Sequence, residues 1–123
     1  MIDSASSGHW EHIVEVSELP QSFDFVTARC SIGPVLVTRD AAGALHVLSN
    51  TCPHQRATVC REPAGRAERF ECPNHYWLFA PDGRFLGSRL SVASGRAATD
   101  DPSKNLARAD VTVTDGWVMA RFR

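Results

Sequence analysis

Two short stretches of this sequence decide its fold class: T-C-P-H at residues 51–54 and E-C-P-N-H-Y-W at residues 71–77. Each stretch has one cysteine with a histidine two or three residues later, and a proline directly follows each cysteine. Proline fixes the backbone φ angle and stiffens the loop in which it lies. The stretches therefore indicate two rigid loops that each offer one thiolate and one imidazole to a metal centre. The candidate ligands are Cys52, His54, Cys72 and His75.

Three interpretations of these four residues compete. Two sulfide-bridged iron ions can be held with both thiolates on one iron and both imidazoles on the other. A structural zinc site can also use two cysteines and two histidines, but its cysteines usually share one knuckle with C-x₂₋₄-C spacing. The third interpretation is four unrelated residues, two of them ordinary buried cysteines. Because each loop supplies one residue of each type, the spacing favours a [2Fe–2S] cluster.

Length and composition indicate a single domain. The chain has 123 residues, 43% hydrophobic residues and a net charge of −1, which favours neither nucleic acid nor a membrane as a partner. We expect residues 1–9 to form a flexible tail and residues 10–123 to form the domain. Residues 1–9 lack the pattern of a secretory signal, and no apolar run reaches the ~18 residues of a membrane span. We therefore expect a cytoplasmic protein.

The remaining cysteines, Cys30 and Cys60, lie outside the two ligand stretches. Disulfides are rare in a reducing cytoplasm. We therefore expect two free thiols, with a Cys30–Cys60 disulfide as the alternative.

Short β-branched runs separated by Gly, Pro and Asp predict an all-β sandwich or barrel. The ligand segments fall between strands, on loops, and Ser88–Asn105 reads as a long polar surface loop. Hairpin turns are predicted at Asp40–Gly43, Pro81–Gly83 and Asp115-Gly116. The predicted strands are His12–Val16, Phe23–Arg29, Pro34–Arg39, Ala44–Ser49, Glu68–Glu71, Trp77–Ala80, Arg84–Leu86, Arg108–Thr114 and Trp117–Phe122.

The chain resembles the Rieske domain of the Rieske non-haem iron oxygenases, the bacterial ring-hydroxylating and demethylating enzymes. The family pattern is C-x-H-R-G followed by C-P-Y-H-G-W, and this sequence reads C-P-H-Q-R-A and C-P-N-H-Y-W. The resemblance runs from about Trp10 to Phe122. It implies a Rieske-type antiparallel β-sandwich with a cluster-binding subdomain of two loops. It also implies one [2Fe–2S] cluster per chain, with Cys52, His54, Cys72 and His75 as ligands.

The sequence departs from that pattern in both loops. Gln55-Arg56-Ala57 replaces the usual Arg-Gly, and Tyr76 replaces a glycine. Respiratory Rieske proteins add a disulfide between the loops, but Asn74 stands where its second-loop cysteine would be. Trp77 stands where those proteins place a serine that hydrogen-bonds the cluster. Fewer such hydrogen bonds predict a low reduction potential, roughly −150 mV.

Trp77 has two interpretations, which are compatible. It could cover the cluster, or it could be a core aromatic at the start of a strand.

An oxygenase also needs a mononuclear iron site, usually two histidines and a carboxylate. Outside the cluster motif only His9, His12 and His46 remain, and the sequence places none of them in such a group. We therefore expect a one-electron carrier rather than a complete enzyme, with a reductase and an oxygenase catalytic protein as partners.

Two settings remain open for that carrier. One is the Rieske part of an oxygenase assembly, as an oligomer with oxygenase subunits, whose catalytic iron lies on another polypeptide or domain. In that setting the resemblance implies that His75 approaches a carboxylate of a neighbouring subunit. The alternative is a free-standing Rieske ferredoxin between a reductase and an oxygenase. A zinc-binding structural module is a third, weaker reading.

Overall fold

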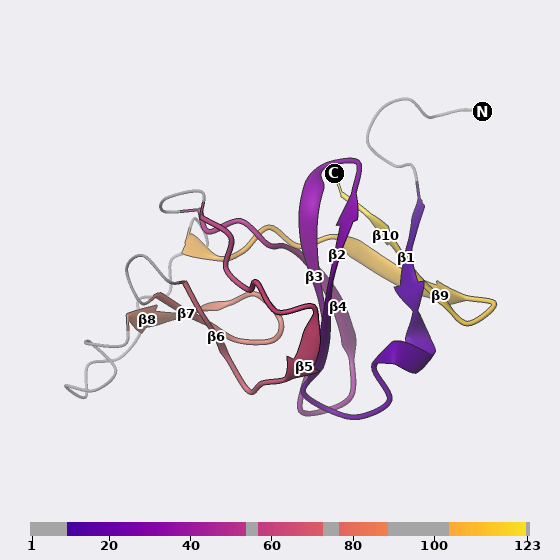
Figure 1. Ribbon diagram of the computed structural model, residues 1–123, viewed down its shortest axis with the longest axis horizontal. Helices are drawn as coiled ribbons and strands as arrows, with labels where there is room; N and C mark the ends of the chain where they lie inside the picture. Colours follow the sequence, from indigo (N-terminus) through magenta and orange to yellow (C-terminus); the bar gives the residue numbers. More distant parts are fainter. Residues whose placement is uncertain (1–9, 54–56, 73–76, 89–103, 123) are drawn as a thin grey trace.

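The computed structural model describes residues 10–53, 57–72, 77–88 and 104–122, and within them ten strands form three antiparallel sheets (Figure 1). The first sheet has the order β1-β10-β9 and contains β1 (Glu11–Glu15), β9 (Asp110–Thr114) and β10 (Trp117–Arg121). The second has the order β4-β3-β2-β5 and contains β2 (Asp24–Cys30), β3 (Gly33–Arg39), β4 (Leu45–Ser49) and β5 (Ala64–Arg66). The third contains β6 (Phe70–Glu71), β7 (Trp77–Phe79) and β8 (Phe85–Ser88).

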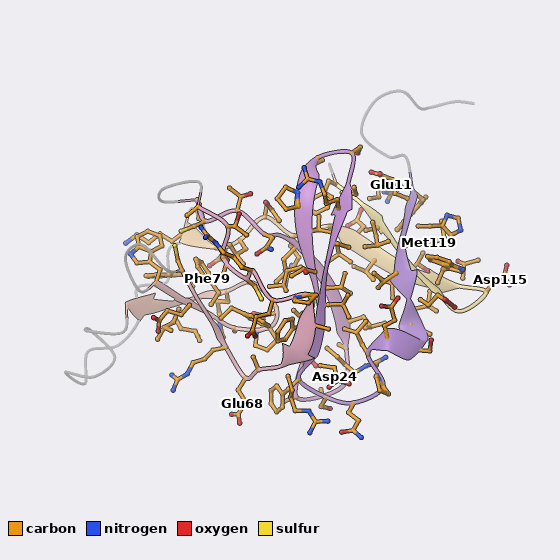
Figure 2. The ribbon with its side chains drawn as sticks, viewed as in Figure 1. Glu11, Asp24, Glu68, Phe79, Asp115 and Met119 are labelled. Carbon is orange, nitrogen blue, oxygen red and sulfur yellow. The ribbon has the colours of Figure 1, made fainter. Side chains whose placement is uncertain are left out.

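The four-stranded sheet is the middle layer and is covered on both faces. Side chains alternate between the two faces of a strand. Val35 and Val37 of β3 belong to one core cluster with Val118 of the first sheet. Leu36, between them, belongs to a second cluster with Phe79 of the third sheet (Figure 2). Coverage of both faces explains why β3 is an unbroken apolar run rather than an alternating one.

The predicted all-β antiparallel fold is confirmed, and most strand boundaries differ from the prediction by one or two residues. Two boundaries are wrong for a clear reason. Val16 was predicted to end a strand, but it begins a short 3-10 helix, η1 (Val16–Glu18), whose carbonyl at Val16 accepts a hydrogen bond from Leu19. Phe23 was predicted to begin a strand, but its φ of 70° is incompatible with extended backbone, so β2 starts at Asp24.

Strand β5 was not predicted at all. Its sequence is Ala-Gly-Arg, its side chains are exposed, and it pairs only with β2, at the edge of the middle sheet. A Cβ atom on Gly65 would lie 3.0 Å from the ring of Phe25. Glycine is needed here because the aromatic ring lies directly against the strand backbone, and such a strand carries no β-branched pattern for a sequence reading to detect.

Several predictions concern residues that the structure does not describe. The predicted tail, residues 1–9, and most of the predicted loop Ser88–Asn105 lie outside the described residues, so the domain boundary at residue 10 stays a prediction. The same holds for Tyr76 and for Gln55 and Arg56. Within the described ranges, no helix is long and apolar enough to cross a membrane.

Candidate metal centre

The two predicted ligand loops are closed by the same kind of backbone hydrogen bond and are flanked by the same kind of antiparallel pair. The backbone N–H of Cys52 donates a 2.8 Å hydrogen bond to the carbonyl oxygen of Ala57, and that of Cys72 donates one of 2.8 Å to Trp77. In both loops, donor and acceptor are five positions apart. Antiparallel pairs flank both loops, Thr51 with Thr58 and Glu71 with Leu78. Each loop is therefore the tip of a hairpin, and each hairpin tip begins at a cysteine.

The side chains of the two cysteines are inside the protein. Cys52 and Cys72 both have 0% exposure, and both belong to the core cluster between the second and third sheets, together with Phe79 and Leu106. The structure thus brings two of the four predicted ligands into one buried region. His54 and His75 lie outside the described residues. Among the described residues alone, no group of three or more His, Cys, Asp and Glu side chains could hold a metal ion.

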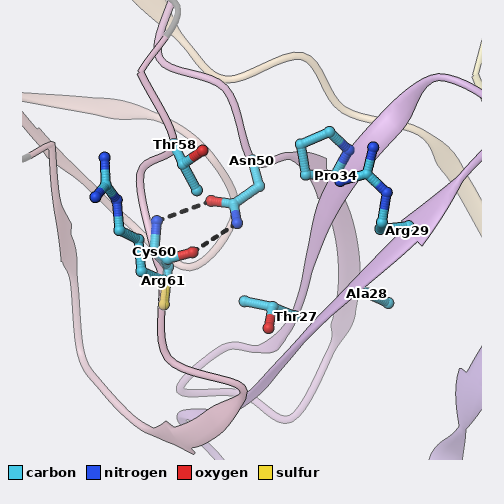
Figure 3. Close-up of a pocket in the computed structure, with 8 residues that line it drawn as sticks. All are labelled: Thr27, Ala28, Arg29, Pro34, Asn50, Thr58, Cys60 and Arg61. Carbon is cyan, nitrogen blue, oxygen red and sulfur yellow. Dashed lines mark hydrogen bonds between the residues drawn. The ribbon is translucent and has the colours of Figure 1, made fainter.

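Asn50 anchors the first loop to the middle sheet. Its side-chain N–H donates a 2.7 Å hydrogen bond to the carbonyl oxygen of Cys60, and its Oδ1 accepts one of 2.9 Å from the Cys60 N–H (Figure 3). Its backbone N–H donates to Pro34 of β3, and its carbonyl oxygen accepts from Val59. Asn50 is 2% exposed, so these bonds are shielded from water. The residues before and after the loop are thereby held together.

Cys60 is a free thiol in this anchor and not part of the predicted ligand set. It borders a polar hollow of about 430 Å³ between β2, β3 and the end of the first loop, at which Arg29 and Arg61 are exposed (Figure 3). Burial raises the pKa of the Cys60 thiol. Cys30 is also a free thiol, as the sequence predicted. A thiol with a raised pKa is a poor nucleophile and a poor metal ligand.

Aromatic side chains support the second loop. The rings of Trp77 and Phe85 lie 4.6 Å apart, and those of Phe79 and Phe85 lie 6.1 Å apart. Trp77 is half-buried and packs against the cluster that contains both cysteines. The structure therefore shows Trp77 as a core aromatic next to the second loop. The other interpretation, that Trp77 covers the bound cluster, stays a prediction.

The turn between β7 and β8 is tied to the rest of the protein at three points. The Thr38 hydroxyl of β3 donates to the carbonyl oxygen of Pro81, and the Leu106 N–H donates to that of Gly83. The Phe85 N–H donates a 2.9 Å hydrogen bond to Oδ1 of Asn105. The Thr38 contact fixes this turn to the middle sheet, and the other two fix it to the segment that precedes β9.

Two further histidines have structural partners. Nε2 of His46 lies 2.8 Å from Oδ2 of Asp40, beside the turn between β3 and β4. The His12 ring packs edge-on against Trp117, with ring centroids 5.4 Å apart. His9 lies outside the described residues.

The donor set fits a cluster with mixed ligands. A [2Fe–2S] centre of this kind takes two thiolates on one iron. Two cysteines at matching positions of two matching hairpin tips, both shielded from water, meet that requirement. The backbone around each is held by hydrogen bonds to its own loop, which keeps the side chains oriented.

Comparison with known proteins identifies the family. A model of the Rieske [2Fe-2S] domain matches residues 9–93. The chain belongs to the Rieske [2Fe–2S] domain family. The cofactor of this Rieske domain is accordingly a Rieske-type [2Fe–2S] cluster, as the two loops predicted.

Relatives of this Rieske domain include the alpha subunit of a demethylase and the large subunit of a dioxygenase. The chain is 36% identical over 100 residues to the N,N-dimethyl phenylurea N-demethylase subunit alpha of Sphingobium sp. (strain YBL2), covering 81% of this chain and 22% of that protein. It is 39% identical over 77 residues to the anthranilate 1,2-dioxygenase large subunit of Acinetobacter baylyi, covering 63% and 16%. The chain thus spans about a fifth of the length of the curated relatives it matches.

Solved structures agree with this assignment. Naphthalene 1,2-dioxygenase with bound indole superposes with a TM-score of 0.82 at 25% identity, over 95% of this chain and 26% of that one. A quaternary ammonium Rieske monooxygenase in complex with gamma-butyrobetaine superposes with a TM-score of 0.77 at 23% identity, over 93% and 32%. The first likeness supports the family and the second supports the fold alone.

Sequence reasoning missed the residues that hold the loops of this Rieske domain in place. Asn50 and Thr38 carry no metal-binding chemistry, and their partners lie far away in the sequence or on the backbone. The position of Asn50 directly before T-C-P-H was the one available signal. A buried amide beside a ligand loop is the group that satisfies the loop's backbone donors and acceptors.

Proposed function

We propose that this Rieske domain transfers single electrons to a non-haem iron oxygenase centre that lies on another polypeptide or domain. In this proposal Cys52, His54, Cys72 and His75 hold the cluster. The cluster that these residues would hold would supply one-electron chemistry between two partners, a reductase and an oxygenase catalytic protein. The observation that carries the proposal is the pair of matching hairpin tips, each beginning at a buried cysteine, in a chain of the Rieske family.

The protein's own residues have two tasks in this function. Burial of Cys52 and Cys72 excludes water from the sulfur side of the site. The hydrogen bonds from the Cys52 and Cys72 N–H groups hold the backbone around each cysteine in place. The oxygenase setting is favoured over a free-standing ferredoxin because the relatives described above are a demethylase subunit alpha and a dioxygenase large subunit. An oligomer with oxygenase subunits is part of this proposal.

Ligand replacement tests the assignment. The chain is prepared anaerobically with iron and sulfide, and both are quantified with the visible spectrum. We expect Cys72→Ser and Cys52→Ser to lose the cluster and much of the stability, because free energy of metal binding is also free energy of folding. The matched control is Cys60→Ser, which should keep the spectrum. Full iron and sulfide in Cys72→Ser would refute the ligand set, and bound zinc without sulfide would favour the structural module.

Electron transfer is tested directly with the reduced protein. The reduced domain is mixed with an oxygenase catalytic component, and reoxidation is followed by absorbance. We expect reoxidation that depends on the concentration of that component, and a midpoint potential at the low end of the Rieske range, roughly −150 mV. Reoxidation that is independent of the component would contradict the proposed role.

A further inference from the structure

Lys104 is the only lysine in the chain, among twelve arginines. Its Nζ lies 5.8 Å from the ring centroid of Trp77 and 5.4 Å from that of Phe85. Both distances are within the range at which an ammonium group is attracted to the face of an aromatic ring. Lys104 therefore lies on the Trp77–Phe85 pair that supports the second ligand loop.

The backbone next to Lys104 is fixed to that same hairpin. Oδ1 of Asn105 accepts a hydrogen bond from the Phe85 N–H, and the Leu106 N–H donates to the carbonyl oxygen of Gly83. Lys104 is half-buried. Its charge is thus held at one place on the protein rather than being carried by a freely moving side chain.

Within the part of the chain that the structure describes, no carboxylate forms an ion pair with Lys104. The ion pairs among the described residues join His46 with Asp40, Arg66 with Asp24, and Arg121 with Asp110, and none includes Lys104. A half-buried charge acts over a longer distance than an exposed one, because less water and salt screen it.

The aromatic pair links this charge to the ligand loop. The carbonyl oxygen of Trp77 accepts the hydrogen bond from the N–H of Cys72 that closes the loop. Phe85 belongs to the same buried cluster as Cys52 and Cys72. The ammonium group therefore lies on two aromatic rings that pack in or against the cluster containing both cysteines.

We propose that Lys104 is a positioning residue that holds a positive charge on the Trp77–Phe85 pair and so raises the reduction potential of the bound cluster. This inference rests on the proposed function. Reduction adds one negative charge, and a fixed positive charge nearby stabilises the reduced state. A purely structural contact would leave the potential unchanged once the protein has folded.

Three variants of the cluster-loaded protein test the inference. Lys104→Met keeps the apolar stem and removes the charge, whereas Lys104→Arg keeps both the charge and the ring contact. We expect the Met variant at low ionic strength to lower the equilibrium constant for reduction at least threefold, about 28 mV for one electron. The Arg variant should match the wild type. Arg84→Met, which removes an exposed cation in the β7–β8 turn, should change the potential less than Lys104→Met does.

A chemical experiment does not depend on whether a variant folds. Acetylation of amines in the folded, cluster-loaded wild type can neutralise only Lys104 and the N-terminus, because the chain has no other lysine. We expect the potential to fall as in Lys104→Met. The same treatment of Lys104→Arg modifies the N-terminus alone and should leave the potential unchanged.

The outcomes separate this inference from the proposed function. A wild type that binds iron and sulfide, with no change of potential after acetylation or in the Met variant, would overturn the role of Lys104 alone. An equal fall in Arg84→Met would also overturn it, since a diffuse charge effect would then suffice. A wild type that binds no cluster would overturn the proposed function and this inference together.

Discussion

The hydroxyl of Thr38 on β3 donates a 2.5 Å hydrogen bond to the carbonyl oxygen of Pro81, and both residues are buried. Thr38 is 43 positions before Pro81 in the chain. The bond therefore joins the middle sheet to the far end of the hairpin whose tip begins at Cys72. Together with the contacts of Gly83 and Asn105, it holds the turn between β7 and β8 in place.

Removal of the Thr38 hydroxyl should destabilise the domain. Thr38→Val keeps the shape of the side chain but leaves the buried carbonyl oxygen of Pro81 without its donor, which costs about 1–3 kcal/mol. Chemical denaturation of the cluster-loaded protein measures this loss. Thr112→Val, on the exposed part of β9, is the matched control and should change stability by less than about 0.5 kcal/mol. Equal effects at the two positions would contradict this account.

Gly83 should tolerate no side chain. Its φ is +89°, and an added Cβ would lie 2.9 Å from Cδ2 of Leu48. Gly43 has nearly the same φ, +88°, with nothing within 4 Å of an added Cβ. Gly43→Ala thus measures the backbone strain alone, about 1–2 kcal/mol, and Gly83→Ala adds the clash. We expect a larger loss of stability and of cluster content in Gly83→Ala than in Gly43→Ala. Similar losses in the two variants would show that the hairpin can shift to make room for the added Cβ atom.

Asn50 should be required for a stable first loop. Asn50→Leu has a similar volume but removes both hydrogen bonds to the Cys60 backbone, which we expect to cost about 1–3 kcal/mol. Iron and sulfide content at equilibrium should fall with it, since the loop that begins at Cys52 is held by this anchor. Cys60→Ser keeps the same backbone bonds and should have wild-type stability. Normal cluster content and stability in Asn50→Leu would refute the anchor role.

The pair of Asp40 and His46 should contribute to stability in a pH-dependent way. The hydrogen bond from His46 holds the pKa of Asp40 below its ordinary value of 3.8, with further help from the backbone N–H groups of Ala44 and Ala42 and against the effect of burial. Folding thus favours the ionised carboxylate. Its contribution is fully present above pH about 5 and is lost as the pH falls through 3.8 towards the lowered pKa.

Asp40→Asn tests this dependence. The variant should be less stable than the wild type near neutral pH, by about 0.5–1 kcal/mol for a partly exposed pair. The difference should shrink as the pH falls below 3.8. Asp82→Asn is the control, because Asp82 accepts one backbone hydrogen bond, from Arg84, in a turn of similar size. A loss of stability in Asp40→Asn, relative to the wild type, that grows as the pH falls would contradict this account.

Residue spacing and strand patterning were enough to predict the family, the cofactor class and the all-β fold. These depend on local patterns: the C-x-H and C-x-x-H spacings, the alternation within strands and the glycine turns. A ligand set could be proposed from the sequence because metal chemistry restricts both residue type and spacing. The ligand roles of Cys52, His54, Cys72 and His75 stay a prediction, and the structure adds that both cysteines are buried.

Only the tertiary structure decided which residues hold the loops in place. The 3-10 turn at Val16, the positive φ of Phe23 and the exposed strand at Gly65 were all missed because their conformations depend on distant partners, not on local propensity. The same is true of Thr38, Asn50 and Lys104. A hydrogen bond or a cation–π contact joins atoms that are near in space but far along the chain, so no periodicity in the sequence reports it.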